Sequence, residues 1–249
     1  MIMLLLSSNI LAESAYIKRN RSSISLDFEI RKNRFLSLLK DKNPDILLLQ
    51  EADEPWFPHL EEYFDNYNFT HSIVKSRDKY QIIAWNNENL HKVDDSEYNS
   101  KEPGIQSIDF ICKNSKTAFR TVNIHAPYNK ASDYKIEYEA VLTSSDKCLI
   151  AGDFNIDDNP NAGFFSTLMD SLGYQNHCSI IPFTARSVKH GKGELLDFVY
   201  SLNLNEVKTH IVPSDIKLLI PHSEVSDFDE KNCDNHYSDH AALFAEFYF

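Results

Sequence analysis

Short, uninterrupted apolar runs recur along the whole chain and alternate with segments whose apolar residues have helical spacing. The run Asp45–Gln50 reads Asp-Ile-Leu-Leu-Leu-Gln, which predicts a strand that is covered on both faces. The segment before it, residues 28–42, has the periodicity of a helix and stops at Asn43-Pro44. Alternation of this kind down to the last residue predicts an α/β protein.

The same patterns give the order of the remaining elements. Strands are predicted at residues 2–6, 45–50, 69–74, 80–85, 105–112, 118–124, 147–151, 195–201, 206–212 and 241–249, and helices at 28–42, 56–64, 133–142 and 161–172. Several neighbouring strands are joined by short polar turns, which indicates antiparallel pairs. We therefore expect two packed mixed β-sheets with outer helices. Because there is no repeat and no linker rich in Pro, Gly or Ser, a single domain over residues 1–249 is expected.

The charge balance limits the kind of partner. There are 25 Lys and Arg residues against 37 Asp and Glu residues, a net charge of −12. This argues against a protein that coats duplex nucleic acid by bulk electrostatics. It does not exclude a nuclease, because an acidic cluster that holds metal ions contributes negative charge itself. We expect a monomer with no stable membrane insertion, and the sequence suggests no protein partner.

Cysteines and apolar runs bear on the compartment. The cysteines, at positions 112, 148, 178 and 233, are far apart and form no Cys-x-x-Cys pair, which favours buried thiols in a reducing compartment. No run approaches the ~18 apolar residues of a membrane span. Cleavage after the apolar start, Ile2–Leu6, would remove the nearby Asn9. We therefore expect an intracellular protein with no cleaved signal peptide and no transmembrane segment.

Small groups of carboxylate, amide or imidazole residues lie at the ends of five predicted strands. Because ligands of α/β proteins bind where strand ends meet loops, we expect these groups to converge. Taken singly, each is also ordinary turn, cap or core chemistry. The groups are Ser7-Ser8-Asn9, Gln50-Glu51, His125, Gly152-Asp153-Phe154-Asn155 and, before the last strand, Ser238-Asp239-His240.

As an ordered set, these groups resemble the endonuclease/exonuclease/phosphatase superfamily. The most specific pieces are Gly-Asp-Phe-Asn at 152–155 and Ser-Asp-His at 238–240. Leu-Asp-Phe-Val-Tyr-Ser at 196–201 is similar to the Leu-Asp-Tyr-Ile strand of that family. The resemblance covers essentially the whole chain. It implies a four-layer αββα sandwich with the active site at the top of the two sheets.

The resemblance also implies the chemistry, which is in-line attack of water on a phosphate ester with Mg²⁺, or Mn²⁺ as a substitute. Metal ligands would be Glu51, Asn9 and Asp239, since Mg²⁺ prefers carboxylate oxygens and retained waters. No His-rich or Cys-rich spacing suggests zinc. The implied catalytic set is Asp153 to position or deprotonate water, Asn155 to orient phosphate or nucleophile, His125 and His240 to contact phosphate, and Asp197 to orient His240.

Within the superfamily, Ser-Asn-Ile-Leu-Ala at 8–12 looks like the opening of the deadenylase, nocturnin and Angel branch. This favours a nuclease acting on RNA or single-stranded nucleic acid. The alternatives are a phosphatase or phospholipase-type enzyme acting on inositol phosphate or sphingomyelin, and a tyrosyl-DNA phosphodiesterase. A non-catalytic binding protein on this fold is a further alternative, which the complete set of site residues disfavours.

Substrate contacts are predicted outside this set. Arg186, Lys189 and Lys192 precede the Asp197 strand and could hold a second phosphate, although a solvated turn explains them equally well. Trp56, Tyr128 and Tyr134 are candidates for base stacking, against the commoner role of aromatic residues in cores and on surfaces.

Overall fold

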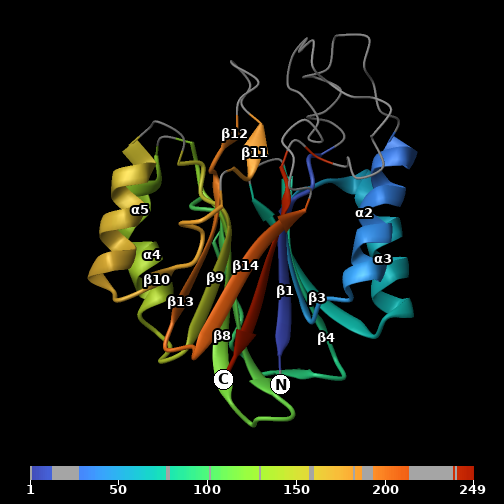
Figure 1. Ribbon diagram of the computed structural model, residues 1–249, viewed down its shortest axis with the longest axis horizontal. Coiled ribbons are helices and arrows are strands. Elements are labelled where there is room, and N and C mark those ends of the chain that lie inside the picture. The colour runs from blue at the N-terminus through green and yellow to red at the C-terminus, as the bar shows by residue number, and fades with distance from the viewer. Residues whose placement is uncertain are drawn as a thin grey trace.

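The computed structural model describes residues 2–12, 28–76, 79–100, 102–128, 130–156, 160–181, 183–186, 193–212, 238 and 240–249. Within these ranges, two mixed sheets lie face to face at the centre of the molecule (Figure 1). The first sheet contains, in spatial order, β14 (Glu206–Val212), β15 (Ala242–Tyr248), β1 (Met3–Asn9), β2 (Ile46–Ala52), β4 (Lys79–Asn86) and β3 (Phe69–Ser76).

The second sheet carries the shorter edge strands. It contains β10 (Gln175–Asn176), β13 (Asp197–Leu202), β9 (Cys148–Asp153), β8 (Ala118–His125), β7 (Ile105–Cys112) and β5 (Leu90–Lys92), with β6 (Tyr98–Ser100) also paired to β7. A separate two-stranded ribbon is formed by β11 (Ala185–Arg186) and β12 (Gly193–Glu194).

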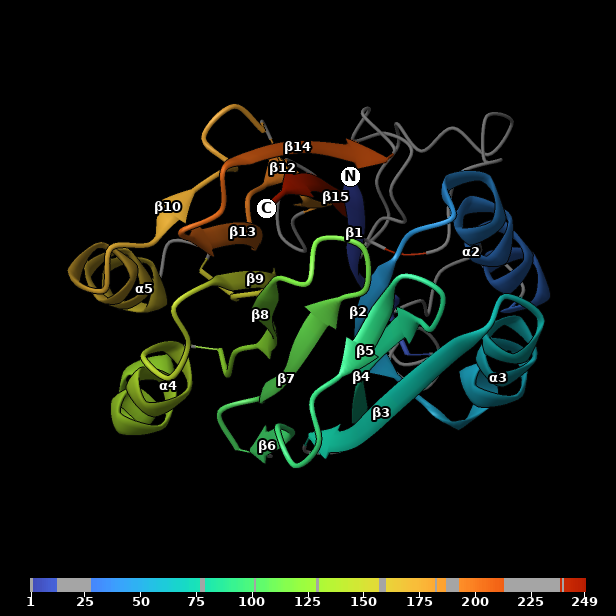
Figure 2. The same cartoon turned by 90° about the horizontal axis from the view of Figure 1, so that it is seen from below.

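Helices cover the outer face of each sheet (Figure 2). On the first sheet lie α2 (Phe28–Lys42) and α3 (Phe57–Asn66), the latter preceded by a 3₁₀ turn, η1 (Glu54–Trp56). On the second lie α4 (Lys135–Leu142), preceded by η2 (Ala131–Tyr134), and α5 (Pro160–Ser171). The expected four-layer αββα sandwich of mixed sheets is therefore confirmed.

Strand β2 shows why these runs fold this way. Its residues Ile46 and Leu48 enter the core between the two sheets, whereas Leu47 and Leu49 enter the core under α2 and α3. All four side chains are fully buried, as expected for a strand covered on both faces. Burial of this kind provides most of the driving force for folding.

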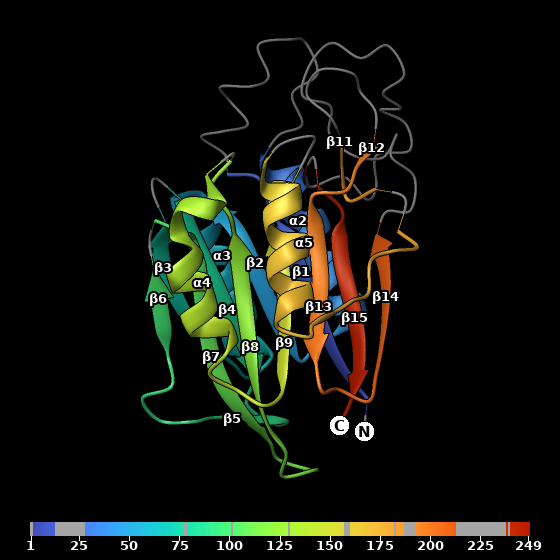
Figure 3. The same cartoon turned by 90° about the vertical axis from the view of Figure 1, so that its left-hand side faces the viewer.

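Strand directions bring the polar groups to one end of the molecule. Strands β1 and β2 are parallel, and so are β8 and β9, while β13 and β15 run antiparallel to their neighbours β9 and β1. The last residues of β1, β2, β8 and β9 therefore lie beside the first residues of β13 and β15. This end is opposite to the two chain termini, which lie together at the foot of the sheets (Figure 3).

Some sequence predictions need correction. Strand β1 does not end at Leu6 but continues to Asn9, because its parallel pairing with β2 extends to Asn9 and Gln50. Trp56 is no base-stacking platform: it is fully buried and makes edge-to-face contacts with Phe28 and Phe35. Tyr128, by contrast, is 57% exposed, so its predicted role stays open.

Two further expectations concern thiols and membranes. Cys112, Cys148 and Cys178 are buried free thiols, as predicted, and Cys233 lies outside the described residues. Burial raises the pKa of Cys178 to about 12, which makes this thiol unreactive at neutral pH. None of the helices in the described ranges combines the length and apolar character needed to cross a bilayer.

Candidate active site

Carboxylates and imidazoles alternate in one line across the ends of both sheets. His125 Nε2 lies 3.7 Å from Glu51 Oε1 and 4.0 Å from Asp153 Oδ2. His240 Nε2 lies 3.9 Å from the same Asp153 oxygen, and His240 Nδ1 lies 2.8 Å from Asp197 Oδ2. The line therefore runs Glu51, His125, Asp153, His240, Asp197. It joins β2 of the first sheet to β8, β9 and β13 of the second, with His240 just before β15.

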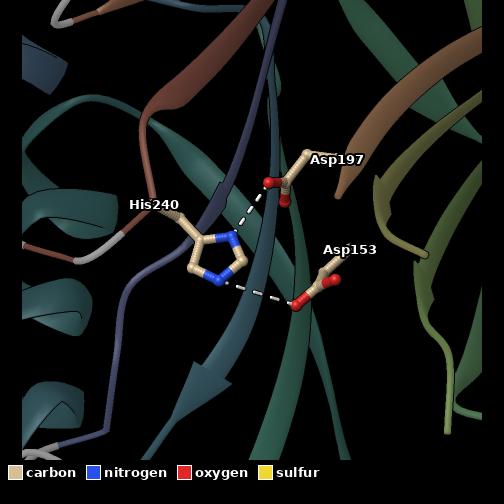
Figure 4. Close-up of side chains that lie close together, drawn as sticks. All are labelled: Asp153, Asp197 and His240. Carbon is tan, nitrogen blue, oxygen red and sulfur yellow. Dashed lines mark hydrogen bonds and ion pairs between the residues drawn. The ribbon is translucent and has the colours of Figure 1, made fainter. Parts of the chain in front are cut away.

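His240 is the more firmly held imidazole. Figure 4 shows its ring between two carboxylates, with one nitrogen directed to Asp197 and the other to Asp153. A carboxylate accepts the proton of Nδ1, which fixes the tautomer and leaves Nε2 for the centre of the site. Burial raises the pKa of Asp197 above its ordinary value, and the neighbouring His240 opposes this effect only in part.

Backbone contacts set the position of Asp197. The hydroxyl oxygen of the buried Thr184 accepts the N–H groups of Leu196 and Asp197, at 2.9 and 2.8 Å. Thr184 O in turn accepts the N–H of Ala241, at 2.7 Å. One residue thus links the start of β13 to the chain beside His240. Thr184 does not stand out in the sequence, and only its place in the loop before the Asp197 strand could have suggested this role.

Asp153 is fixed through both carboxylate oxygens. Its Oδ1 accepts the backbone N–H of Asn155 at 2.9 Å, and its Oδ2 accepts the side-chain amide of Asn9 at 3.1 Å. The side chain is nearly fully buried. The glycine before it is required by geometry: Gly152 has φ +144°, and a Cβ there would lie 2.0 Å from Ile124 O on β8. Glycine at this position therefore lets β9 lie against β8 and carry Asp153 to the site.

Asn155 adopts a left-handed backbone conformation, φ 49°, which asparagine tolerates better than most residues. Its side chain donates to Ala126 O at 2.9 Å and so joins the loop after β9 to the loop after β8. Its predicted role toward phosphate or nucleophile stays a prediction. The observed contact is structural and holds the loop that follows His125.

Glu51 reaches the site through an irregularity in β2. The pairing of β2 with β4 shifts register between Leu49 and Ala52, and Glu51 has φ 55°. A left-handed conformation in a residue with a Cβ costs of order 1–3 kcal/mol and persists only where the surroundings impose it. Such bulges redirect side chains, and here the Glu51 carboxylate points toward His125.

Asn9 and Ser238 connect the first sheet to the chain before β15. Asn9 Oδ1 accepts the N–H of Leu11 at 3.1 Å, while its amide donates to Asp153. The Ser238 hydroxyl donates to Asn9 O at 2.7 Å and accepts the N–H of His240 at 3.2 Å. The serine of the Ser-Asp-His motif thus positions the backbone on both sides of the site, a role that its place in the motif did not reveal.

For four predicted site residues the described structure gives no side-chain contact with the site. Asp239, Lys189 and Lys192 lie outside the described residues. For Arg186 the β11 backbone pairs with Gly193 of β12. The predicted roles of these residues stay predictions.

The donor chemistry fits a divalent cation. The carboxylates of Glu51 and Asp153 supply the oxygen ligands that hard cations prefer. Asp153, Asp197 and His240 also place ligand atoms within 4.8 Å of one another and could hold a metal between them. Coordination by Nδ1 would require the nitrogen lone pair, however, and a carboxylate 2.8 Å away favours the tautomer in which that nitrogen carries its proton. We therefore regard Asp197 and His240 as an orienting pair.

A four-layer sandwich with such a site is the architecture of a class of phosphoesterases. The family model described as Endonuclease/Exonuclease/phosphatase family matches residues 6–240, and the chain belongs to this family. Members of the family are phosphoesterase and nuclease hydrolases that generally depend on divalent metal, so the chain is a hydrolase acting on phosphate esters. No curated protein sequence compared with the chain matched it.

Solved structures share the fold at low sequence identity. The human nocturnin catalytic domain with bound sulfate is 15% identical, with a TM-score of 0.73 over 100% of this chain and 93% of that one. ANGEL2, a 2′,3′-cyclic phosphatase in complex with adenosine-2′,3′-vanadate, is 15% identical, with a TM-score of 0.73 over 99% and 95%. A family protein from Bacteroides vulgatus is 16% identical, with a TM-score of 0.71 over 100% and 99%.

Proposed function

We propose that the protein is a Mg²⁺-dependent phosphodiesterase that cleaves RNA or single-stranded nucleic acid by in-line attack of water. The observation that carries this proposal is the position of Asp153. Its Oδ2 lies within 4.0 Å of both imidazoles while Asn9 donates to it. The Asp153 carboxylate lies between two imidazoles that could donate hydrogen bonds to a phosphate. A carboxylate in this position is suited to act on a water molecule that attacks the phosphorus atom.

Asp153 would take the proton of the attacking water. Its two hydrogen bonds, from Asn155 N–H and the Asn9 amide, hold the carboxylate in one orientation. Such fixed orientation contributes to rate because the reacting groups need no reorganisation. General-base assistance of this kind contributes about 10²- to 10⁴-fold.

His240 and His125 would bind the phosphate oxygens. The Asp197 carboxylate stabilises the doubly protonated form of His240, whose Nε2–H then points toward the centre of the site. Donors fixed at the place where negative charge develops lower the barrier to reaction. His125 would make the second contact from the opposite side of Asp153.

Glu51 would hold the cation together with Asn9 and Asp239. When bound, Mg²⁺ supplies Lewis acidity to the phosphate and lowers the pKa of coordinated water. Glu51 supports this role because its carboxylate is directed into the site and only partly buried. In the described geometry the Asn9 side-chain nitrogen donates to Asp153, and its oxygen accepts the N–H of Leu11, which leaves that oxygen a second lone pair for a metal.

The choice of nucleic acid rests on the motif at residues 8–12 and on the likeness of fold to nocturnin and ANGEL2. The purified protein should be incubated with Mg²⁺, with Mn²⁺ and with EDTA. The substrates are poly(A) RNA, mixed RNA, single- and double-stranded DNA, adenosine 2′,3′-cyclic phosphate, sphingomyelin and an inositol polyphosphate.

Metal-dependent cleavage of RNA or single-stranded DNA is the expected result, and the product lengths would give the direction of cutting. Hydrolysis of only the cyclic phosphate, the lipid or the inositol phosphate would replace the proposed substrate but keep the chemistry. No hydrolysis with any metal would favour the binding-protein alternative.

A further inference from the structure

Three amide side chains lie in the interface between the sheets, next to the carboxylates and imidazoles of the site. They are Gln50 on β2, Gln81 on β4 and Asn123 on β8, and all three are fully buried. Gln50 precedes Glu51, and Asn123 precedes His125 by two residues. Buried amides are costly unless they are hydrogen-bonded, so their contacts indicate what they hold in place.

Asn123 uses every polar group of its side chain across the interface. Its Oδ1 accepts Gln50 Nε2 at 2.7 Å. Its Nδ2 donates to two backbone carbonyls of the first sheet, Leu49 O and Ile82 O, each at 3.1 Å. A single side chain of the second sheet therefore joins two strands of the first.

Those two carbonyls belong to the last regular pair before the bulge. Strands β2 and β4 pair through Leu49 and Ile82, and the ladder resumes only at Ala52 and Tyr80. Glu51, with φ 55°, lies between these pairs. Gln81, opposite the bulge, donates to Asn123 O at 3.4 Å and to Gly104 O at 3.2 Å, and Gly104 O also accepts the N–H of His125.

We propose that Asn123 is a positioning residue that holds the β2 bulge and so directs Glu51 toward the metal position. The same strand that carries His125 thereby fixes the opposing Glu51, which sets the 3.7 Å separation of the two side chains across the interface. This inference rests on the proposed function of Glu51 as a metal ligand. Residues that orient metal ligands typically change metal affinity or activity by about 10- to 100-fold when they are replaced.

The chain offers a matched control next to Asn123. Gln106 lies opposite Asn123 in the β7–β8 register and is equally buried. It also crosses the interface, donating to Ser72 O at 3.1 Å and Ser72 Oγ at 3.0 Å, but these atoms belong to β3 rather than to the bulge. Gln106→Leu therefore removes cross-sheet hydrogen bonds of the same kind without touching Glu51.

The test compares wild type, Asn123→Leu, Gln106→Leu and Glu51→Ala. The rise in Tm with increasing Mn²⁺ or Mg²⁺ gives the metal half-saturation without any substrate, and hydrolysis gives kcat and KM. Asn123→Leu should raise the half-saturating metal concentration by about tenfold or more. Gln106→Leu should lower Tm without changing that concentration. Adding Asn123→Leu to Glu51→Ala should have little further effect on metal binding, because Asn123 acts only through the ligand that Glu51→Ala already removes.

The outcomes separate this inference from the function beneath it. If Glu51→Ala leaves the metal half-saturation unchanged, the proposed metal role of Glu51 fails. If Glu51→Ala weakens metal binding but Asn123→Leu matches Gln106→Leu, only the positioning role fails. If Asn123→Leu does not fold, Gln50→Met, which removes the contact to Asn123 Oδ1, decides the question by the same comparison.

Discussion

The two imidazoles on either side of Asp153 are held in different ways. His240 is hydrogen-bonded to Asp197 at 2.8 Å, and its neighbourhood is fixed by Ser238 and Thr184. His125 lies 3.7 Å from Glu51 and 4.0 Å from Asp153, both longer than a hydrogen bond. The half of the site around His240 is organised by short hydrogen bonds. The half around His125 depends on the Glu51 carboxylate, which a strained bulge carries.

This difference suggests a division of labour. The His240 half is set by the protein alone, so damage there should lower turnover at every metal concentration. The Glu51 half presents a hard carboxylate, so damage there should depend on how much metal is supplied. The following variants test the division, beginning with the largest expected effect.

His240→Ala removes the more firmly held of the two imidazoles that we propose contact the phosphate. We expect turnover to fall by about 10²-fold or more, the usual scale for a lost transition-state donor. The loss should be equal at low and saturating Mg²⁺, as measured by steady-state hydrolysis. His91→Ala, which replaces an exposed histidine on β5, is the control. A loss that disappears at high Mg²⁺ would move His240 to the metal-binding half.

Asp197→Asn keeps the shape of the orienting group and removes its charge. The amide accepts the Nδ1 proton less well and no longer stabilises protonated His240. Turnover should fall by about 10- to 100-fold, with an unchanged metal half-saturation. If metal binding weakens instead, Asp197 is a metal ligand, as the clustering of Asp153, Asp197 and His240 also permits.

Glu51→Ala should also lower activity, but by an amount that depends on the Mg²⁺ concentration. Since it removes the proposed metal ligand, activity should fall most at low Mg²⁺ and recover in part when Mg²⁺ is raised. A Mg²⁺ titration of activity, with the exposed neighbour Glu54→Ala as control, measures this directly. An equal loss at all metal concentrations would refute the metal role and remove the contrast between the two halves.

Thr184→Val tests the support of Asp197 and has the smallest expected effect on rate. It leaves the buried N–H groups of Leu196 and Asp197 without their hydroxyl acceptor, at a cost of about 1–3 kcal/mol in the free energy of unfolding. Turnover should fall only a few-fold, a modest effect compared with about 10²-fold for a direct contact.

Thermal unfolding gives the stability change. Thr121→Val is the matched control, since the buried Thr121 hydroxyl has no hydrogen-bond partner among the described residues. If both valine variants lose the same stability, the Thr184 contact does not support the start of β13.

Much of the fold and of the site could be predicted because both follow local rules. Apolar runs of strand length set the sheets, and the polar groups after them, in their order, matched a known family. Asp197 and His240 were predicted as a pair, and the structure places His240 Nδ1 2.8 Å from Asp197 Oδ2. Strands of two or three residues, such as β11 and β6, were missed because so few residues carry no periodicity.

The remaining features depend on contacts between distant segments. Asn123 of the opposite sheet contacts the strand at the bulge that carries Glu51, and no residue pattern within β2 predicts this bulge. The sequence left Trp56 open between base stacking and the commoner role in a core or on a surface, and the packing around it buries its ring. Such outcomes depend on tertiary packing rather than on local sequence.

We propose above all that Asp153 activates water at a metal-dependent site shared by both sheets. The most direct test is hydrolysis of the best substrate by wild type and Asp153→Asn across a Mg²⁺ titration, with Tm recorded for both proteins. We expect a folded variant whose turnover is lower by about 10²-fold or more at every Mg²⁺ concentration. A folded Asp153→Asn variant with near-normal turnover would contradict it and move the chemistry away from this carboxylate.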